Sequence, residues 1–489
     1  MSLSKTSVPI WIACGMVALL AGCNSSSSGS SSSDDNGGSG GGGSSATSAL
    51  PSEHFFIGDD GNAGVPSSAR QLWITDGTED GTRMVKDIVP GGDPNMQQLT
   101  VAGDRLFFTA DDGGGTALWV SDGTEDGTKR VDMPEATNVP NRMTAMGDDI
   151  YFRATHQTKG IELWFSDGTS AGTDVVTEIN PGGNYSYPDL LTVMDDMLYF
   201  AARDDSEKDE LWRTDGTEAG TENVAVIRDD GVVGGLYNST SKDMVTMNNR
   251  LYFSANDGDI GAELWTSDGS VGDADLVKEI NEGDQDSLPR VFRVAGDTLY
   301  FFASDEDRGA SDSLNFRLWK SDGTEAGTQR IEVPNDDIAM LPGADDPMIV
   351  VGDRIYLAVH NTDKHTGRAL ELWTTDGGDL EKVVAMDESV LASPRIRWAA
   401  VGDSLYFIAY ASDDQTFRGI WKADGTDLTL VESFDGGAAG GLPFIAGSDG
   451  ETLLFQRQGE MWRTDGTESG TVLVKDICPG TCEGFIEAP

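Results

Sequence analysis

A short pattern, Trp-x-x-Asp-Gly, recurs nine times along this chain and constrains its fold more than any other feature. Its tryptophans are Trp73, Trp119, Trp164, Trp212, Trp265, Trp319, Trp373, Trp421 and Trp462. Successive copies lie 46, 45, 48, 53, 54, 54, 48 and 41 residues apart. A period of this length indicates an array of similar structural units that stack on one another.

Each repeat after the first contains four short segments typical of β-strands, and the first repeat begins near its second segment. An apolar-aromatic segment such as "RLFFTA" (105–110) lies upstream of most of the tryptophans, and a shorter segment precedes it. The shorter segments supply a column of large apolar residues: Leu99, Met143, Leu191, Met244, Phe292, Met348 and Trp398. Four-stranded units at this period are typical of propeller blades. We therefore predict an all-β fold, a β-propeller of four-stranded blades, with nine blades by count and eight if a terminal unit stands apart.

The motif "ELWRTDGTEAGT" around Trp212 is interpreted as a folding device. Asp215-Gly216 suits a tight hairpin turn, because Gly accepts positive φ and the Asp carboxylate can bond a backbone N–H two residues on. Gly220-Thr221 lets the chain leave the turn. We place Trp212 on the third strand as a wedge between neighbouring blades. The aspartates are interpreted as turn residues, not as metal ligands.

Three copies keep the first turn and lose the second Gly-Thr pair. They are the copies that follow Trp265, Trp373 and Trp421. We expect the outermost hairpin to differ in these three repeats.

The first residues are typical of a bacterial lipoprotein signal. An apolar run ends in "LAGC", too short to span a membrane comfortably and suited to cleavage before Cys23. We predict a signal peptide over 1–22, and lipidated Cys23 with a disordered Ser/Gly linker over 23–48. The propeller follows over 49–489. The outer membrane is the expected location, with either the periplasmic or the outer face.

Cys478 and Cys482 are the two thiols left after lipidation. Two cysteines cannot complete a structural zinc site, and an exported compartment favours oxidation, so we expect a disulfide between them. The tail from Gly484 is a candidate for the inner strand that the first unit lacks, which would close the ring.

The chain is strongly acidic, with 83 Asp and Glu against 34 Lys and Arg and a net charge of −49. Such a surface repels nucleic acid, which we exclude as a partner. Solubility in a saline habitat explains the charge, and a cation store is the alternative.

The repeat resembles that of the bacterial ELWxxDGT-repeat proteins, some of which are called hyalin-like. The resemblance covers residues 54 to 480 and includes the downstream "VKDI" at 85–88 and 474–477. It implies a secreted or surface protein, often a lipoprotein, with a propeller fold, and it carries no catalytic residues to transfer.

Six residues in the connections between repeats are our candidate ligand contacts. They are Tyr185, Tyr187, Tyr237, Arg290, Arg395 and Arg397. In a propeller these connections surround the mouth of the central channel, and aromatic and arginine side chains on loops suit a sugar or an anionic group. The alternative is that these loops pack on their own blades.

Catalytic patterns are weak. No zinc-protease, kinase, nucleophile-elbow or phosphate-loop pattern occurs. Tyr151, Arg153 and His156 are of the types found in polysaccharide lyases, but Tyr151 holds the strand position of the repeat. The tips "GDDGN" (58–62), "ADDGGG" and "ANDGDIG" lack the spacing of a calcium loop, so solvated turns are favoured and weak Ca²⁺ binding is the alternative. No other cofactor is expected.

These observations favour a monomeric, non-enzymatic binding or adhesion scaffold, held at the membrane by its lipid anchor. Its expected partner is a glycan or another envelope or surface protein. The alternative is a propeller enzyme, either polysaccharide-degrading or a quinone-dependent dehydrogenase. A factor that assembles other envelope proteins is a third reading.

Overall fold

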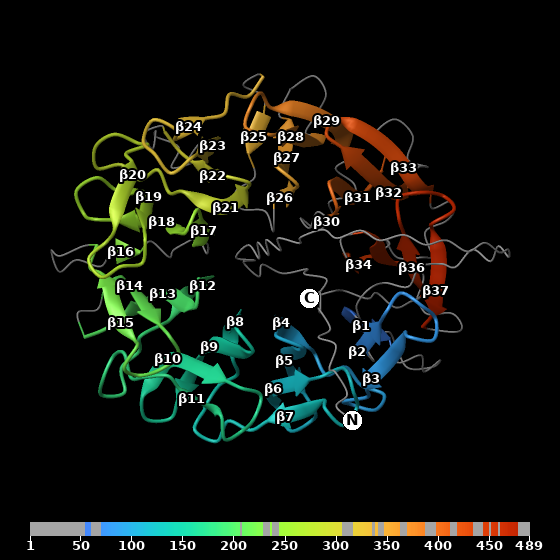
Figure 1. Ribbon diagram of the computed structural model, residues 1–489, viewed down its shortest axis with the longest axis horizontal. Coiled ribbons are helices and arrows are strands. Elements are labelled where there is room, and N and C mark those ends of the chain that lie inside the picture. The colour runs from blue at the N-terminus through green and yellow to red at the C-terminus, as the bar shows by residue number, and fades with distance from the viewer. Residues whose placement is uncertain are drawn as a thin grey trace, which may run out of the picture.

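The computed structural model describes residues 54–59, 70–205, 208–227, 235–236, 244–305, 316–334, 338–340, 347–361, 369–386, 398–410, 418–433, 444–448, 451–457 and 460–477. Their strands form nine blades arranged in a ring (Figure 1), so the predicted all-β propeller and the count of nine are confirmed. Within these ranges the structure contains no helix long and apolar enough to cross a membrane.

The first five blades run in chain order. Blade 1 has β1 (His54–Asp59), β2 (Arg70–Thr75) and β3 (Arg83–Lys86); blade 2 has β4 (Gln97–Ala102), β5 (Arg105–Asp111), β6 (Thr116–Ser121) and β7 (Lys129–Val131). Blade 3 has β8 (Asn141–Met146), β9 (Asp149–His156), β10 (Gly160–Ser166) and β11 (Thr173–Val175); blade 4 has β12 (Asp189–Met194), β13 (Met197–Arg203), β14 (Asp209–Thr214) and β15 (Glu222–Ala225). Blade 5 has β17 (Val245–Met247), β18 (Arg250–Asn256), β19 (Ala262–Ser267) and β20 (Asp275–Lys278).

The remaining four blades complete the ring. Blade 6 has β21 (Arg290–Ala295), β22 (Thr298–Ala303), β23 (Arg317–Ser321) and β24 (Gln329–Arg330); blade 7 has β26 (Met348–Val351), β27 (Arg354–Asn361), β28 (Ala369–Thr375) and β29 (Glu381–Met386). Blade 8 has β30 (Trp398–Val401), β31 (Ser404–Tyr410), β32 (Arg418–Asp424) and β33 (Asp427–Ser433); blade 9 has β34 (Phe444–Ser448), β35 (Leu453–Arg457), β36 (Glu460–Thr464) and β37 (Val472–Asp476). Two short strands supplement blades, namely β16 (Gly235–Leu236) and β25 (Ile338–Met340).

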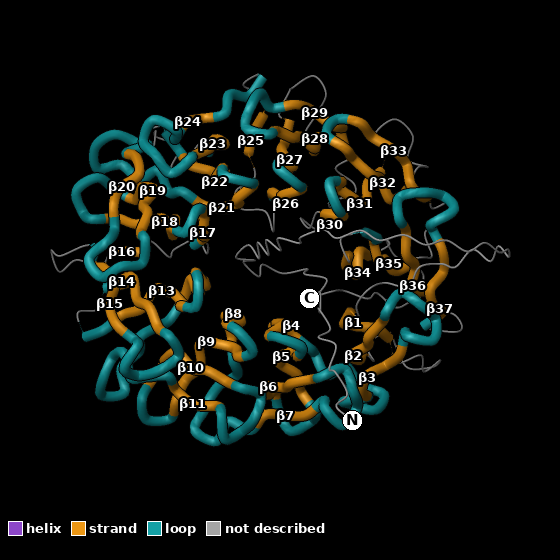
Figure 2. Tube along the Cα trace, viewed as in Figure 1, coloured by secondary structure: helices purple, strands orange, loops and turns teal. Residues whose placement is uncertain are grey.

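Neighbouring strands of a blade pair antiparallel in chain order, and turns join them (Figure 2). The first strand of a four-stranded blade lies nearest the centre of the ring and the last lies at the rim (Figure 1). In the four-stranded blades the motif tryptophan lies on the third strand and pairs with a large apolar residue of the second. That residue is a phenylalanine for Trp164, which pairs with Phe152, and a leucine for Trp373, which pairs with Leu357. This order follows from short alternating segments separated by Gly-rich turns.

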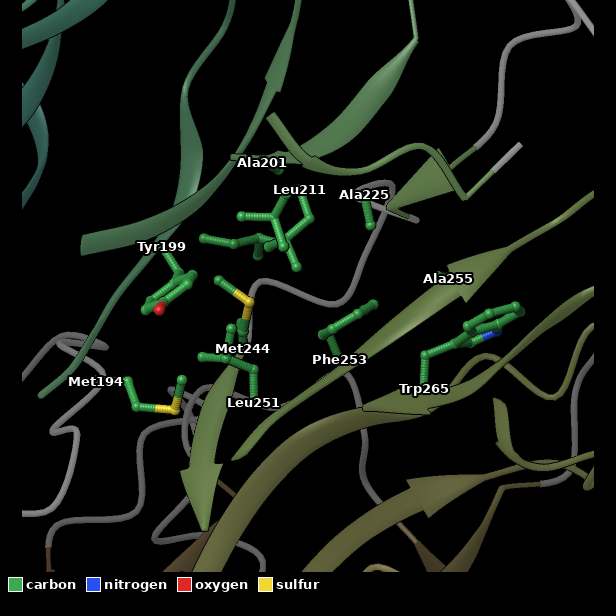
Figure 3. Close-up of a cluster of buried hydrophobic side chains, with 12 residues drawn as sticks. Met194, Tyr199, Ala201, Leu211, Ala225, Met244, Leu251, Phe253, Ala255 and Trp265 are labelled. Carbon is green, nitrogen blue, oxygen red and sulfur yellow. The ribbon is translucent and has the colours of Figure 1, made fainter. Parts of the chain in front are cut away.

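The core consists of apolar clusters between neighbouring blades. In the cluster between blades 4 and 5, Tyr199 and Leu211 meet Phe253 and Trp265 across the interface (Figure 3). The described residues form nine such clusters, one for each pair of neighbouring blades. Because each blade buries its apolar faces only against its neighbours, the ring is the unit that folds.

The ring is closed between blade 9 and blade 1. Leu454 and Met461 pack against Phe56 and Trp73 across this interface. The Lys475 ammonium also donates hydrogen bonds to the carbonyls of Glu79 and Thr82 in blade 1, at 3.0 and 2.6 Å. Lys86 makes the same pair of bonds from blade 1 to blade 2. The lysine of the "VKDI" segment therefore links consecutive blades. The closing strand predicted from Gly484 lies outside the described residues.

The repeated motif folds as a self-contained turn. The Asp215 carboxylate accepts hydrogen bonds from the N–H and hydroxyl of Thr217, at 2.9 and 2.6 Å. These bonds lower the pKa of Asp215, the hydroxyl bond contributing most. Thr217 in turn accepts from the Gly220 N–H, and Thr221 shares a hydrogen bond of 2.7 Å with Thr214. The predicted role of Asp215 is confirmed.

The second Gly-Thr pair has a more specific role than the one predicted. Its threonine is hydrogen-bonded to the Ser or Thr that precedes Asp-Gly in six repeats. The three repeats without this pair have different hairpins, as expected; in blade 5, for example, Ser267 donates to the Asp273 carbonyl instead.

The wedge role of the tryptophans is confirmed, with one correction to its extent. Trp164 is 1% exposed, and Trp73, Trp119, Trp265, Trp319 and Trp373 are also buried. Trp212, chosen from sequence as the example, packs against the cluster between blades 3 and 4 but is only half-buried, as are Trp421 and Trp462. Trp398 is likewise half-buried against a core cluster.

Candidate functional site

The connection between β11 and β12 carries the candidate site. It joins the rim of blade 3 to the innermost strand of blade 4 and contains Tyr185 and Tyr187. In the equivalent connection between β20 and β21, residues 279–289 match 178–188 without a gap. The two can therefore be compared position by position.

The two connections share one backbone conformation. The Ser186 N–H donates to the Ile161 carbonyl at 2.8 Å, and the equivalent Ser287 N–H donates to the Ala262 carbonyl at 3.0 Å. The position after each serine has positive φ, 47° at Tyr187 and 50° at Leu288. The two connections therefore share a backbone scaffold and differ in the side chains that it carries.

A buried glutamate holds each scaffold in place. Glu162 Oε2 accepts hydrogen bonds from the Ile179 N–H at 3.1 Å and from the Ser186 hydroxyl at 2.7 Å. Glu263 makes the same bonds to Ile280 and Ser287, at 2.8 and 2.7 Å. Both glutamates are fully buried. This glutamate is the first letter of the ELW motif, which gives it a role in positioning the connection.

Burial raises the pKa of Glu162 to about 7 and that of Glu263 to about 8, because the charged form loses its hydration. Hydrogen bonds from the serine and from backbone N–H groups offset part of this rise. In blade 1 a neutral residue holds the connection in the same way. Gln71 accepts a hydrogen bond from the Ile88 N–H and donates hydrogen bonds to the Val89 and Gly92 carbonyls.

Tyr185 and Tyr187 are exposed on either side of the buried Ser186. Their exposed fractions are 48% and 37%, and their rings meet edge to face with centroids 5.5 Å apart. At the matching positions of the β20–β21 connection stand Asp286 and Leu288, and Leu288 is buried. The tyrosine pair is thus an addition to the scaffold and is not needed to build it.

Arginines of two blades gather beside this pair. Arg203 of β13 lies over the Tyr187 ring, 5.7 Å from its centroid, and forms a bidentate pair with Asp209 at 2.6 and 2.8 Å. Asp189, the first residue of β12, lies 3.2 Å from Arg142 and 3.8 Å from Arg153. We call Tyr185, Tyr187, Arg142, Arg153 and Arg203 the tyrosine–arginine surface.

The structure separates the other predicted ligand residues. Arg290 begins β21, two blades further along the ring, where its guanidinium packs 4.2 Å from the Phe316 ring centroid. Tyr237, Arg395 and Arg397 lie outside the described residues, as do Cys23, Cys478 and Cys482. Of the predicted contacts, Tyr185 and Tyr187 are the pair shown together.

The residues that resembled a lyase set do not share a site. Tyr151 is buried, with its hydroxyl against Gly216 of the next blade. His156 is also buried, and its Nδ1 accepts hydrogen bonds from the N–H groups of Thr158 and Lys159, both at 3.1 Å. That nitrogen caps a hairpin turn.

The acidic hairpin tips use their carboxylates within the turn. Asp111 accepts from the N–H groups of Gly113 and Gly115, and Asp257 accepts from those of Asp259 and Ile260. Over the described ranges, no group of three or more His, Cys, Asp or Glu could hold a metal ion. The tip at 58–62 lies largely outside those ranges.

Sequence reasoning missed the buried Glu162 and Glu263, which we call the glutamate clamp, and it did not place the arginines at this site. One signal was available for the clamp: Glu162 and Ser186 are 24 residues apart, as are Glu263 and Ser287. The arginines give no such signal, because they come from strands of two blades.

No protein-family model and no curated protein matches the sequence. Among solved structures, the chain is similar to one from a study of two prolyl endopeptidases, at 13% identity and a TM-score of 0.41, over 76% of this chain and 54% of that one. It is also similar to the tricorn protease, at 10% and 0.27, over 85% and 46%. A third is the β-propeller domain of the Trilobed protease from Pyrococcus furiosus, at 11% and 0.35, over 78% and 98%.

The chain thus spans about half the length of the first two of these structures. The likeness concerns the propeller fold alone, and nothing of the chemistry of those proteins is transferred to this chain.

Proposed function

We propose that this protein is a lipid-anchored, non-catalytic scaffold of the bacterial outer membrane that binds a glycan through the tyrosine–arginine surface. The observation that carries the proposal is the comparison of two connections with one backbone. One of them displays two exposed tyrosines, where the other has an aspartate and a buried leucine. Paired exposed aromatic rings on a loop that a buried scaffold holds in place are typical of binding sites.

Tyrosine pairs suit sugars because their rings offer flat apolar faces while their hydroxyls stay hydrated. The edge-to-face packing of Tyr185 and Tyr187 restricts both rings before a ligand arrives, which lowers the entropy that binding costs. Glu162 supports this order by holding Ser186 between them.

The same proposal assigns the chain to the ELWxxDGT-repeat lipoproteins. It rests on the nine motif copies and on the "LAGC" sequence before Cys23. A Cys23→Ala variant should be absent from the outer-membrane fraction, because it cannot be lipidated. Retention of that variant in the outer membrane would rule out Cys23 as the anchor.

A glycan array tests the binding role. The full-length chain should bind a defined set of glycans, and the double variant Tyr185→Ala/Tyr187→Leu should lose that binding. Leucine is chosen because Leu288 adopts the same positive φ. As a control, Val271→Asp removes an exposed apolar side chain from blade 5 and should bind as the unmodified chain does.

Two outcomes would contradict the proposal. One is the absence of any glycan bound by the correctly folded chain, which would favour a protein partner and redirect the search to envelope pull-downs. The other is full binding by the double variant, which would place the ligand elsewhere on the ring.

A further inference from the structure

The tyrosine–arginine surface holds more arginines than the carboxylates paired with them, whereas acidic residues predominate in the chain as a whole. The whole chain carries a formal net charge of −49. On this surface Arg142, Arg153 and Arg203 face two carboxylates, Asp189 and Asp209. A locally cationic patch in an acidic surface indicates an anionic ligand, because the rest of the molecule would repel one.

Arg203 is neutralised within the protein, whereas Arg142 and Arg153 share one counter-charge. Arg203 forms its bidentate pair with Asp209. Asp189 lies between Arg142 and Arg153, and its 3.8 Å distance from Arg153 is too long for a hydrogen bond. One positive charge of this pair is therefore in excess.

Arg153 has donors left for a ligand. Its Nε–H donates to Asn141 Oδ1 at 2.9 Å, and within the described part of the chain this is the hydrogen bond that its guanidinium makes. Partial burial lowers the pKa of Arg153, which shows the cost of holding this charge away from water. A guanidinium presents planar pairs of N–H groups that match a carboxylate.

The β20–β21 connection lacks this arrangement. By strand register, Ser254 stands where Arg153 does, since Arg153 pairs with Leu163 and Ser254 with Leu264. Arg290 stands where Asp189 does. Of the two connections compared, the one that carries the tyrosines is thus the one with an arginine at this strand position.

We propose that the glycan bound at this surface is acidic, and that Arg153, supported by Arg142, binds its carboxylate while Tyr185 and Tyr187 contact the sugar rings. This inference rests on the proposed function and names the ligand class for the same surface.

Paired probes test it on the full-length chain. Tetragalacturonate, an alginate tetrasaccharide and a hyaluronan tetrasaccharide are each titrated beside the corresponding methyl ester, which keeps the sugar and removes the charge. At least one acid should bind about tenfold more tightly than its ester, the factor expected from a charge-assisted hydrogen bond. Added salt should weaken the binding of the acid and leave the binding of the ester unchanged.

Arg153→Ser is the diagnostic variant, because Ser254 shows that the strand accepts serine there. It should lose about tenfold in affinity for the acid and nothing for the ester. Arg330→Ser removes one positive charge from blade 6 and should leave both affinities unchanged.

The failures can be told apart. Equal binding of acid and ester, or unchanged acid binding by Arg153→Ser, would overturn the acidic class and leave the glycan-binding role standing. Binding of none of the acids or esters, by a chain that still binds neutral glycans on the array, would overturn the acidic class too. Binding of no glycan of any kind would overturn the proposed function itself.

Discussion

At the scale of single residues, the Asp-Gly turn meets two demands at once. Gly216 has φ of 92°, a conformation that L side chains rarely adopt, and a Cβ there would overlap the hydroxyl of Tyr151 from the preceding blade. Tyr199, Tyr252 and Tyr406 contact the equivalent glycines in the same way. The glycine of the turn is therefore also a contact between blades.

Gly216→Ala should lower the free energy of unfolding by about 1–3 kcal/mol through backbone strain alone, with a further loss from the clash. In the Gly216→Ala background, Tyr151→Phe should restore the stability lost to the clash, because it removes the hydroxyl. Phe107 of blade 2 shows this arrangement, since a Cβ at Gly168 of blade 3 would lie 3.4 Å from its ring. Urea unfolding of both single variants and the double variant separates the two terms. Additive effects would contradict direct contact between the two residues.

The tryptophans should differ in their contribution to stability. Trp164 is 1% exposed and its Nε1–H donates to the Ala154 carbonyl at 3.1 Å, whereas Trp212 is half-buried. Trp164→Ala should cost about 3–5 kcal/mol and Trp212→Ala clearly less. Urea unfolding measures both losses. An equal loss at the two positions would show that the exposed fraction of a motif tryptophan does not indicate how much it stabilises the contact between blades.

At the scale of structural elements, the glutamate clamp joins a strand to the connection that follows its blade. In two blades a buried carboxyl holds the connection through a serine and a backbone N–H, and in blade 1 a glutamine does so. Because Gln71 needs no ionisation, the clamp works in the neutral form. In blades 3 and 5 the ELW glutamate is therefore a clamp that can hold the connection in its protonated form.

This predicts that stability falls as pH rises. The folded-state pKa is raised from 4.5 to about 7 for Glu162 and about 8 for Glu263, so the folded chain binds more protons than the unfolded chain between these values. Each glutamate should therefore lower the free energy of unfolding by on the order of a few kcal/mol as the pH rises from 4.5 to 8.

Glu162→Gln/Glu263→Gln should flatten this part of the pH profile, measured by urea unfolding. The single variants should each remove a part of the slope. A double variant with the slope of the unmodified chain would show that these carboxyls titrate normally in the fold.

At the scale of the whole molecule, stability depends on closing the ring. Lys475 and Lys86 make matching hydrogen bonds, one across the junction of the chain ends and the other at an internal interface. Lys475→Met and Lys86→Met should each cost about 1 kcal/mol in urea unfolding. No loss for Lys475→Met beside a clear loss for Lys86→Met would show that the ring is open in solution.

The repeat predicted the ring because each blade is local in sequence, with strands separated by turns that glycine and aspartate specify. Tyr185 and Tyr187 could be proposed from sequence because they lie in one short connection. Arg142, Arg153 and Arg203 could not, because they stand on strands of two blades that meet only in the folded ring. The half-burial of Trp212 depends on its neighbours in space, which the motif does not encode.

The central claim is that one of the many connections in this ring carries the ligand. Hydrogen–deuterium exchange of the full-length chain, with and without the glycan that binds best on the array, tests it most directly. The claim predicts slower exchange over 178–189, with the matching 279–290 unchanged. Protection spread equally over both connections, or confined to another part of the ring, would contradict it.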